Sequence, residues 1–139
     1  MALRYSTAVR NAGLDSRETT IGPAAVLRIY EGAPPANLTD AATGDLAVEM
    51  TLPADWLAAA SSGSKAKAGT WQDNAESTGA PFDVDPGYFR ILDPTGVTTH
   101  IQGTVTITGG GGDMTIDNDQ IAAGQQVTVT AFTLTAGNA

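Results

Sequence analysis

The C-terminal third of the chain alternates apolar and hydroxyl-bearing side chains at the period of a β-strand. Residues 104–108 read Thr-Val-Thr-Ile-Thr and residues 126–130 read Gln-Val-Thr-Val-Thr, so every second side chain falls on the same face. A glycine run at 109–112 and a turn-forming Asp-Asn-Asp at 117–119 separate these segments. This pattern predicts antiparallel strands with one apolar face and one face lined by hydroxyl groups.

Residues 3 to about 18 are predicted to form the only sizeable helix. Their apolar side chains recur at the spacing of one helical stripe, at Tyr5, Ala8, Val9 and Ala12. We expect this stripe to pack on the edge of a sheet. Arg10 and Arg17 share another face of the helix. Gly22-Pro23 ends the segment because proline cannot continue a helix.

Short strands follow the helix, separated by segments rich in glycine, proline and small polar residues. Branched and aromatic side chains predict strands at residues 26–30, 46–52, 70–72, 88–92, 98–108, 114–117 and 125–135. One helical turn is predicted at residues 55–60, anchored by Trp56 and Leu57. Residues 61–69 and 74–87 are predicted to be loops, and Trp71 between them is expected in the core.

The last predicted strand changes the parity of its apolar positions. Val127 and Val129 fall on one face of a regular strand, whereas Phe132 and Leu134 fall on the other. A strand of period two cannot bury both pairs on one face. We therefore expect either a β-bulge near Ala131 or a passage of the strand from one sheet to another.

Seven or eight short strands with turns between them predict a mainly β fold. The expected architecture is an antiparallel β-sandwich or jelly roll with one N-terminal helix. The 139 residues suffice for a single domain with its own core. Residues 1–22 would be the helical segment of this domain and residues 23–139 its sandwich.

Charge and composition restrict the kinds of partner. The formal net charge is −8, from 15 acidic and 7 basic residues, and no basic residue follows Arg90. An acidic surface repels phosphate backbones, which argues against nucleic-acid binding. The chain has no cysteine, which suits assembly in a reducing cytoplasm. No apolar run approaches the roughly 20 residues that span a bilayer, so no membrane partner is predicted.

Residue types that could support catalysis occur without the partners that catalysis requires. His100 is the only histidine, and no serine stands in a G-x-S-x-G elbow. Residues 62–65 and 64–67 both match S-x-x-K, but the partner motifs of serine–lysine acyltransferases are missing. The glycine run at 109–112 lacks the Lys-Ser or Lys-Thr of a phosphate-binding loop and is predicted to form a wide turn. We predict no enzymatic activity and no cofactor.

Acidic turns and aromatic side chains suggest two binding alternatives. Carboxylate and amide oxygens crowd together as in Ca²⁺ loops, at Asp83 and Asp85 and at Asp113, Asp117, Asn118 and Asp119. Because Asp and Asn also form turns by bonding to their own backbone, we predict no metal site. β-Sandwich domains also bind sugars through exposed aromatic rings, for which the candidates are Trp56, Trp71, Tyr30 and Tyr88.

Several of these segments together resemble a known family. They comprise residues 27–30 with Gly32, 69–73, 88–91, 103–106, 109–114, 117–118, Ile121, 123–125 and 132–135. Through them the chain resembles, over nearly its whole length, the capsid cement (decoration) proteins of short-tailed bacteriophages. The resemblance implies a jelly-roll domain, often dimeric, that binds the outside of an icosahedral shell and bridges neighbouring major capsid proteins.

The predicted function is that of a virion structural protein. The protein would assemble in the host cytoplasm, bind the capsid exterior and stabilise the shell by cross-linking major capsid proteins. The predicted capsid contact is the N-terminal helix with Arg4, Arg10 and Arg17. The alternative function is a carbohydrate- or receptor-binding module of a phage tail or fibre.

Overall fold

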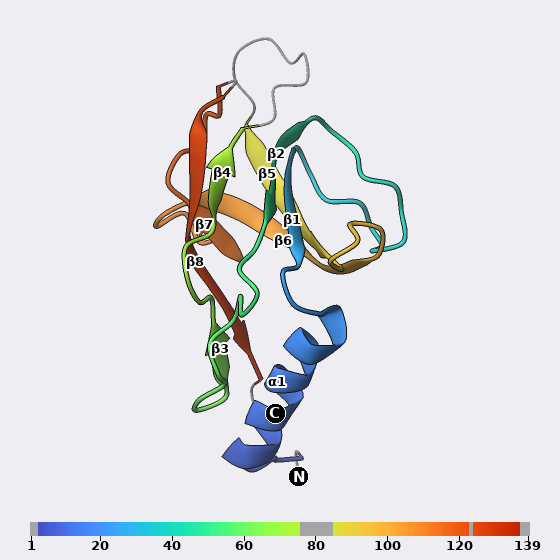
Figure 1. Cartoon of the computed structure of the whole chain (residues 1–139), viewed down its shortest axis with the longest axis vertical. Helices are drawn as coiled ribbons and strands as arrows, with labels where there is room; N and C mark the ends of the chain where they lie inside the picture. Colours follow the sequence, from blue (N-terminus) through green and yellow to red (C-terminus); the bar gives the residue numbers. More distant parts are fainter. Residues whose placement is uncertain (1–2, 76–84, 123, 137–139) are drawn as a thin grey trace.

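The computed structural model describes residues 3–75, 85–122 and 124–136. Within this part of the chain one helix precedes eight strands (Figure 1). In chain order the elements are α1 (Thr7–Ile21), β1 (Val26–Glu31), β2 (Leu46–Thr51), β3 (Ser64–Ala66), β4 (Gln72–Asn74), β5 (Pro86–Leu92), β6 (Thr99–Ile107), β7 (Met114–Ile116) and β8 (Gln126–Thr135). The mainly β class predicted from the sequence is therefore confirmed.

The strands belong to one curled sheet. Its order is β2-β1-β5-β6-β7-β8-β3, and β4 also pairs with β8. Because the sheet curls, β2 approaches β4 and the strands surround a single core, while α1 lies at one end of the sheet (Figure 1). All pairs among the described strands are antiparallel except β6 with β7.

The parallel pair departs from the antiparallel arrangement expected from the sequence. Val105 of β6 lies opposite Met114 of β7, and the chain between the two strands has doubled back along β6. Gly109 and Gly111 adopt positive φ angles of 89° and 83°, which glycine tolerates best. A Cβ atom at Gly112 would lie 2.9 Å from the Thr106 nitrogen. The glycine run is therefore a turn that packs closely on its own neighbouring strand.

Aromatic side chains fill the middle of the curled sheet. The rings of Trp56 and Trp71, which flank β3 in the sequence, lie 6.0 Å apart between centroids. The ring of Phe132 on β8 lies 5.7 Å from Trp71 and 5.5 Å from Phe89 on β5. All four side chains are buried, so the predicted core position of Trp71 is confirmed.

A β-bulge at Thr130 explains the change of parity in β8. Thr115 of β7 pairs with Ala131, whereas Ile116 pairs with Val129, so Thr130 is the extra residue. Apolar side chains on both sides of the bulge consequently enter the same core. The predicted irregularity near Ala131 is confirmed.

α1 begins and ends later than predicted. The Ser6 hydroxyl accepts a hydrogen bond from the Val9 amide at 3.3 Å, which caps the helix at Thr7 and leaves Arg4 ahead of it. The helix continues to Ile21, where Gly22 takes a φ of 107° and donates its amide hydrogen to the Glu18 carbonyl. The predicted role of Gly22 as the end of the helix is confirmed.

The segment between β2 and β4 differs most from prediction. Residues 55–60 form no helical turn; Leu57 instead forms a β-bridge with Lys67. The predicted loop at 61–69 contains β3, which pairs with the end of β8. Small side chains have little preference for strands, so the conformation of this segment is determined by its pairing with a strand far away in the sequence. Of the loop predicted at 74–87, residues 76–84 lie outside the described residues.

Candidate functional site

α1 turns a largely polar side toward the rest of the molecule. The residues on this side, spaced by three or four positions, are Asn11, Leu14, Asp15, Glu18 and Ile21. Within α1 only Leu14 and Ile21 are buried. The Asn11 side-chain oxygen accepts a hydrogen bond from the Gly63 amide at 2.9 Å. Polar contacts therefore contribute much of the attachment of α1 to the turn before β3.

The ammonium group of Lys65 is the centre of these polar contacts. Lys65 lies on β3 and is 3% exposed. Its Nζ lies 2.7 Å from Asp15 Oδ1, 2.9 Å from Glu18 Oε2 and 2.9 Å from the Ala58 carbonyl oxygen. These three acceptors match the three hydrogens of the ammonium group. We call Lys65, Asp15 and Glu18 the Lys65 cluster; it fixes α1 to β3.

The contacts of the Lys65 cluster favour the charged forms of Lys65 and Asp15. Burial acts to lower the pKa of Lys65, but its hydrogen bonds to Asp15 and Glu18 outweigh burial and raise the pKa above 10.5. The hydrogen bond from Lys65, with a second from the Ala60 amide, lowers the pKa of Asp15 below 3.8. Both groups are therefore ionised throughout the neutral range.

Acid is expected to weaken the attachment of α1 through Asp15. Because its pKa is lower in the folded than in the unfolded chain, its stabilising contribution is present above pH 3.8 and is lost as the pH falls through the lower folded value. Urea unfolding of the wild type and Asp15→Asn at about pH 5 and about pH 3 measures this effect. The wild type should lose more stability on acidification than the variant, and equal losses would contradict the prediction.

The apolar side of α1 faces solvent, so the predicted packing of this stripe on a sheet edge is wrong. Val9 in the helix is 56% exposed, and Leu3 and Tyr5, in the segment just before it, are exposed by 73% and 53%. Ala8 and Ala12 are exposed as well. The Lys65 cluster holds the opposite side of the helix against β3, and this orientation turns the apolar stripe outward. Exposed apolar groups gathered on one surface are typical of a binding site.

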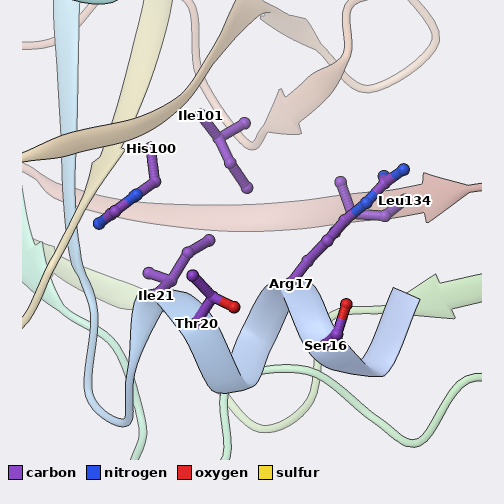
Figure 2. Close-up of a pocket in the computed structure, with 7 residues that line it drawn as sticks. All are labelled: Ser16, Arg17, Thr20, Ile21, His100, Ile101 and Leu134. Carbon is purple, nitrogen blue, oxygen red and sulfur yellow. The ribbon is translucent and has the colours of Figure 1, made fainter. Parts of the chain in front are cut away.

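Two hollows adjoin along one flank of α1. The first has a volume of about 450 Å³ and is lined by Ser16, Arg17, Thr20, Ile21, His100, Ile101 and Leu134. Figure 2 shows the α1 helix below β6 and β8, with the Arg17 side chain extending from the helix up to Leu134. The second, of about 420 Å³, is lined by Tyr5, Val9, Arg10, Gly13, Arg17, Thr135 and Ala136. Arg17 lines both hollows, which therefore meet at this side chain, and Tyr5 and Val9 line the second.

The three arginines predicted to contact a partner have different surroundings. Arg10 and Arg17 line the same hollow, but Tyr5 and Val9 of the apolar stripe line it too, so the arginines do not have a face of their own. Arg10 Nε donates a hydrogen bond to the Ala136 carbonyl at 2.5 Å, which ties α1 to the end of β8. Arg4 and Arg17 are exposed, and neither forms a hydrogen bond or ion pair with the described residues. Arg10 therefore has a structural contact, whereas Arg4 and Arg17 have none.

The remaining basic residues are engaged within the fold. Arg28 pairs with Glu49 at 2.6 Å. Lys67 donates to the Gly69 carbonyl, with Nζ 5.8 Å from the Trp71 ring centroid. The guanidinium of Arg90 is buried and donates to Gln102 and to the carbonyls of residues 37 and 40. Among the described residues, unpaired positive charge is therefore confined to the α1 region of an acidic protein.

The candidate catalytic side chains do not combine into a nucleophile–base pair within the described ranges. His100 lines the first hollow together with Ser16, but the Ser16 hydroxyl donates to the Gly13 carbonyl at 2.8 Å. The lysines of the two S-x-x-K matches bond to other groups, Lys65 in the Lys65 cluster and Lys67 at Gly69.

The acidic turns use their side chains to hold the backbone. Asp113, Asp117 and Asn118 each accept a backbone amide hydrogen bond, from residues 104, 128 and 120. Across residues 3–75, 85–122 and 124–136, no group of three or more His, Cys, Asp or Glu side chains could hold a metal ion. Asp83 lies outside the described residues.

The aromatic candidates for sugar binding belong to the interior. Trp56, Trp71, Tyr30 and Tyr88 are all buried. The indole nitrogens of Trp56 and Trp71 donate to the carbonyls of Gly22 and Ala68, and Tyr30 stacks on Tyr88 with centroids 5.1 Å apart. The carbohydrate-binding alternative thus loses the aromatic surface on which it was based.

Comparison with known proteins identifies no relative. No protein-family model, no curated protein and no solved structure matches the chain. In the described part of the chain, no helix has the length and apolar character needed to cross a membrane.

Proposed function

We propose that this chain is a virion structural protein that binds the outer surface of a tailed-phage capsid and stabilises it by bridging neighbouring major capsid proteins. One observation carries the proposal: the apolar side of α1 faces outward, and beside it Arg17 has no hydrogen bond or ion pair with the described residues. A surface of this kind suits docking on another protein. The proposal includes no catalytic step.

The sheet supplies a frame for this contact. Four of the segments that resemble cement proteins, residues 27–30, 88–91, 103–106 and 132–135, lie in β1, β5, β6 and β8 of the one sheet. The Lys65 cluster and the hydrogen bond of Arg10 attach α1 to β3 and β8 of the same frame. A fixed helix loses little conformational freedom on binding, which favours affinity.

Bridging would stabilise a shell through several weak contacts. When one contact is made, the second forms at a high effective concentration, so the combined binding is stronger than either contact alone. A protein that binds the assembled shell more tightly than its separate subunits shifts the equilibrium toward the intact shell. Dimerisation of the protein on the shell would double the number of contacts.

Co-sedimentation with empty shells tests the proposed function. The purified protein is mixed with shells assembled from the major capsid protein of the same phage and pelleted through a density cushion. We expect saturable pelleting at a fixed ratio to shell subunits and a higher temperature of shell rupture. The absence of pelleting across the titration would contradict the proposal, and specific binding on a glycan array would then favour the tail or fibre alternative.

A further inference from the structure

We propose that the α1 surface, defined by Leu3, Tyr5, Val9, Arg17, Ile101 and Leu134, seats a segment of the major capsid protein that carries apolar side chains flanked by carboxylates. This inference rests on the proposed function for the identity of the partner chain. It adds the chemistry of the segment that the partner must present.

The apolar part of the α1 surface calls for apolar side chains in the partner. Ile101 and Leu134 are half-buried on the core and line the first hollow together with Ile21 (Figure 2). Val9 lines the second hollow and is more than half exposed. Covering these groups with apolar side chains removes apolar area from water, which favours binding. A segment that packs on both sides of Arg17 would reach both hollows.

The charged part of the α1 surface calls for carboxylates. Arg17 lines both hollows, and Arg4 lies in the segment just before the helix. Neither guanidinium has an ion pair among the described residues. A guanidinium binds a carboxylate through two parallel hydrogen bonds, the strongest neutralising contact open to it in a protein interface. The partner segment therefore needs acidic side chains beside its apolar ones.

Charge argues against a second copy of this chain as the occupant. A two-fold interface brings the same patch of both copies together, and none of the described residues that line the two hollows of this patch is acidic. The acidic residues of α1, Asp15 and Glu18, lie on the other side of the helix and bind Lys65. A different chain that carries carboxylates would complement the positive charge of the α1 surface better.

Site-specific photo-cross-linking identifies the occupant. p-Benzoylphenylalanine replaces Val9 in one variant and, as a matched control, Val97, which is 78% exposed outside the α1 surface. Shells saturated with each variant are irradiated, and the cross-linked peptides are sequenced by mass spectrometry. We expect the probe at Val9 to capture one segment of the major capsid protein that contains apolar residues and at least two carboxylates, and the probe at Val97 to capture none. Arg17→Glu should weaken shell binding roughly tenfold and Arg17→Lys less, with a smaller difference at high salt.

The outcomes separate this inference from the proposed function. If the wild type does not pellet with shells, the proposed function fails and this inference fails with it. If the wild type pellets but the Val9 probe captures a second copy, a segment without carboxylates or nothing, only the inference is overturned. Undiminished binding of Arg17→Glu would overturn the charged part of the inference in the same way.

Discussion

Replacing Trp71 with alanine is expected to lower the free energy of unfolding by about 3–5 kcal/mol. Trp71 is 1% exposed, contacts the rings of Trp56 and Phe132, and donates its indole hydrogen to the Ala68 carbonyl. Alanine would leave a cavity in the middle of the core and an unbonded carbonyl beside it. A loss of this size is a large part of the 5–15 kcal/mol typical of a whole domain.

Urea unfolding measures the effect of Trp71→Ala, with Trp71→Phe as the control that keeps an aromatic ring in the core. The phenylalanine variant should lose less stability than the alanine variant at an unchanged slope of the transition. A loss below about 1 kcal/mol for Trp71→Ala would contradict the position of this side chain in the core. That result would also restore Trp71 as a candidate for sugar binding.

Replacing Lys65 with methionine is expected to lower the free energy of unfolding by about 2–3 kcal/mol. The substitution keeps much of the buried side-chain volume but removes the ammonium group from Glu18 and from the Ala58 carbonyl. This loss of stability is smaller than the loss from removing one partner of a fully buried ion pair, because water still reaches the edge of the Lys65 cluster. α1 should lose hydrogen-exchange protection before the sheet does.

Two further variants isolate the role of the Lys65 cluster. Lys67→Met removes a lysine two positions away whose ammonium group bonds only to Gly69 and lies near the Trp71 ring; it should cost less than about 1 kcal/mol. Adding Asp15→Asn and Glu18→Gln to Lys65→Met should recover part of the lost stability, because no uncompensated charge then remains. Equal losses for Lys65→Met and Lys67→Met would refute the cluster as the anchor of α1.

The sheet was predictable because its signals are local. Alternation with period two located the strands, and the parity change between Val129 and Phe132 indicated the bulge that the structure has at Thr130. β3 was missed because Ser, Lys and Ala have no strong preference for strands, and its pairing with β8 depends on residues far away in the chain. The parallel pairing of β6 with β7 likewise depends on the path of the glycine run.

The orientation of α1 was not predictable from the apolar stripe alone. The usual rule buries the apolar side of a helix, yet here Leu14 and Ile21 are buried among the polar Asn11, Asp15 and Glu18. The sequence does carry a signal for this orientation. Two carboxylates, those of Asp15 and Glu18, lie between the buried apolar residues of the helix, and Lys65 stands among small residues. Such a signal becomes decisive only when the partner of each charge is known.

For the arginines, too, the sequence indicates the region of interest, whereas only the structure shows which of them have partners. Composition singled out the N-terminal region because three of its residues are arginines. The structure uses Arg10 to bind the end of β8, whereas Arg4 and Arg17 remain unpaired among the described residues. The contact predicted for all three arginines stays a prediction, and the apolar residues beside them, expected from the sequence to pack on a sheet edge, are exposed.

Shell binding by two valine variants tests the central claim, that the outward side of α1 is a docking surface, most directly. Val9 and Val97 are both exposed, at 56% and 78%, and Val9→Asp and Val97→Asp make the same chemical change inside and outside the α1 surface. Both variants should keep unfolding midpoints close to that of the wild type, since surface changes usually cost about 0.5 kcal/mol or less. Val9→Asp is expected to weaken co-sedimentation with shells at least about 30-fold, and Val97→Asp less than about twofold. Wild-type binding by Val9→Asp would contradict the account.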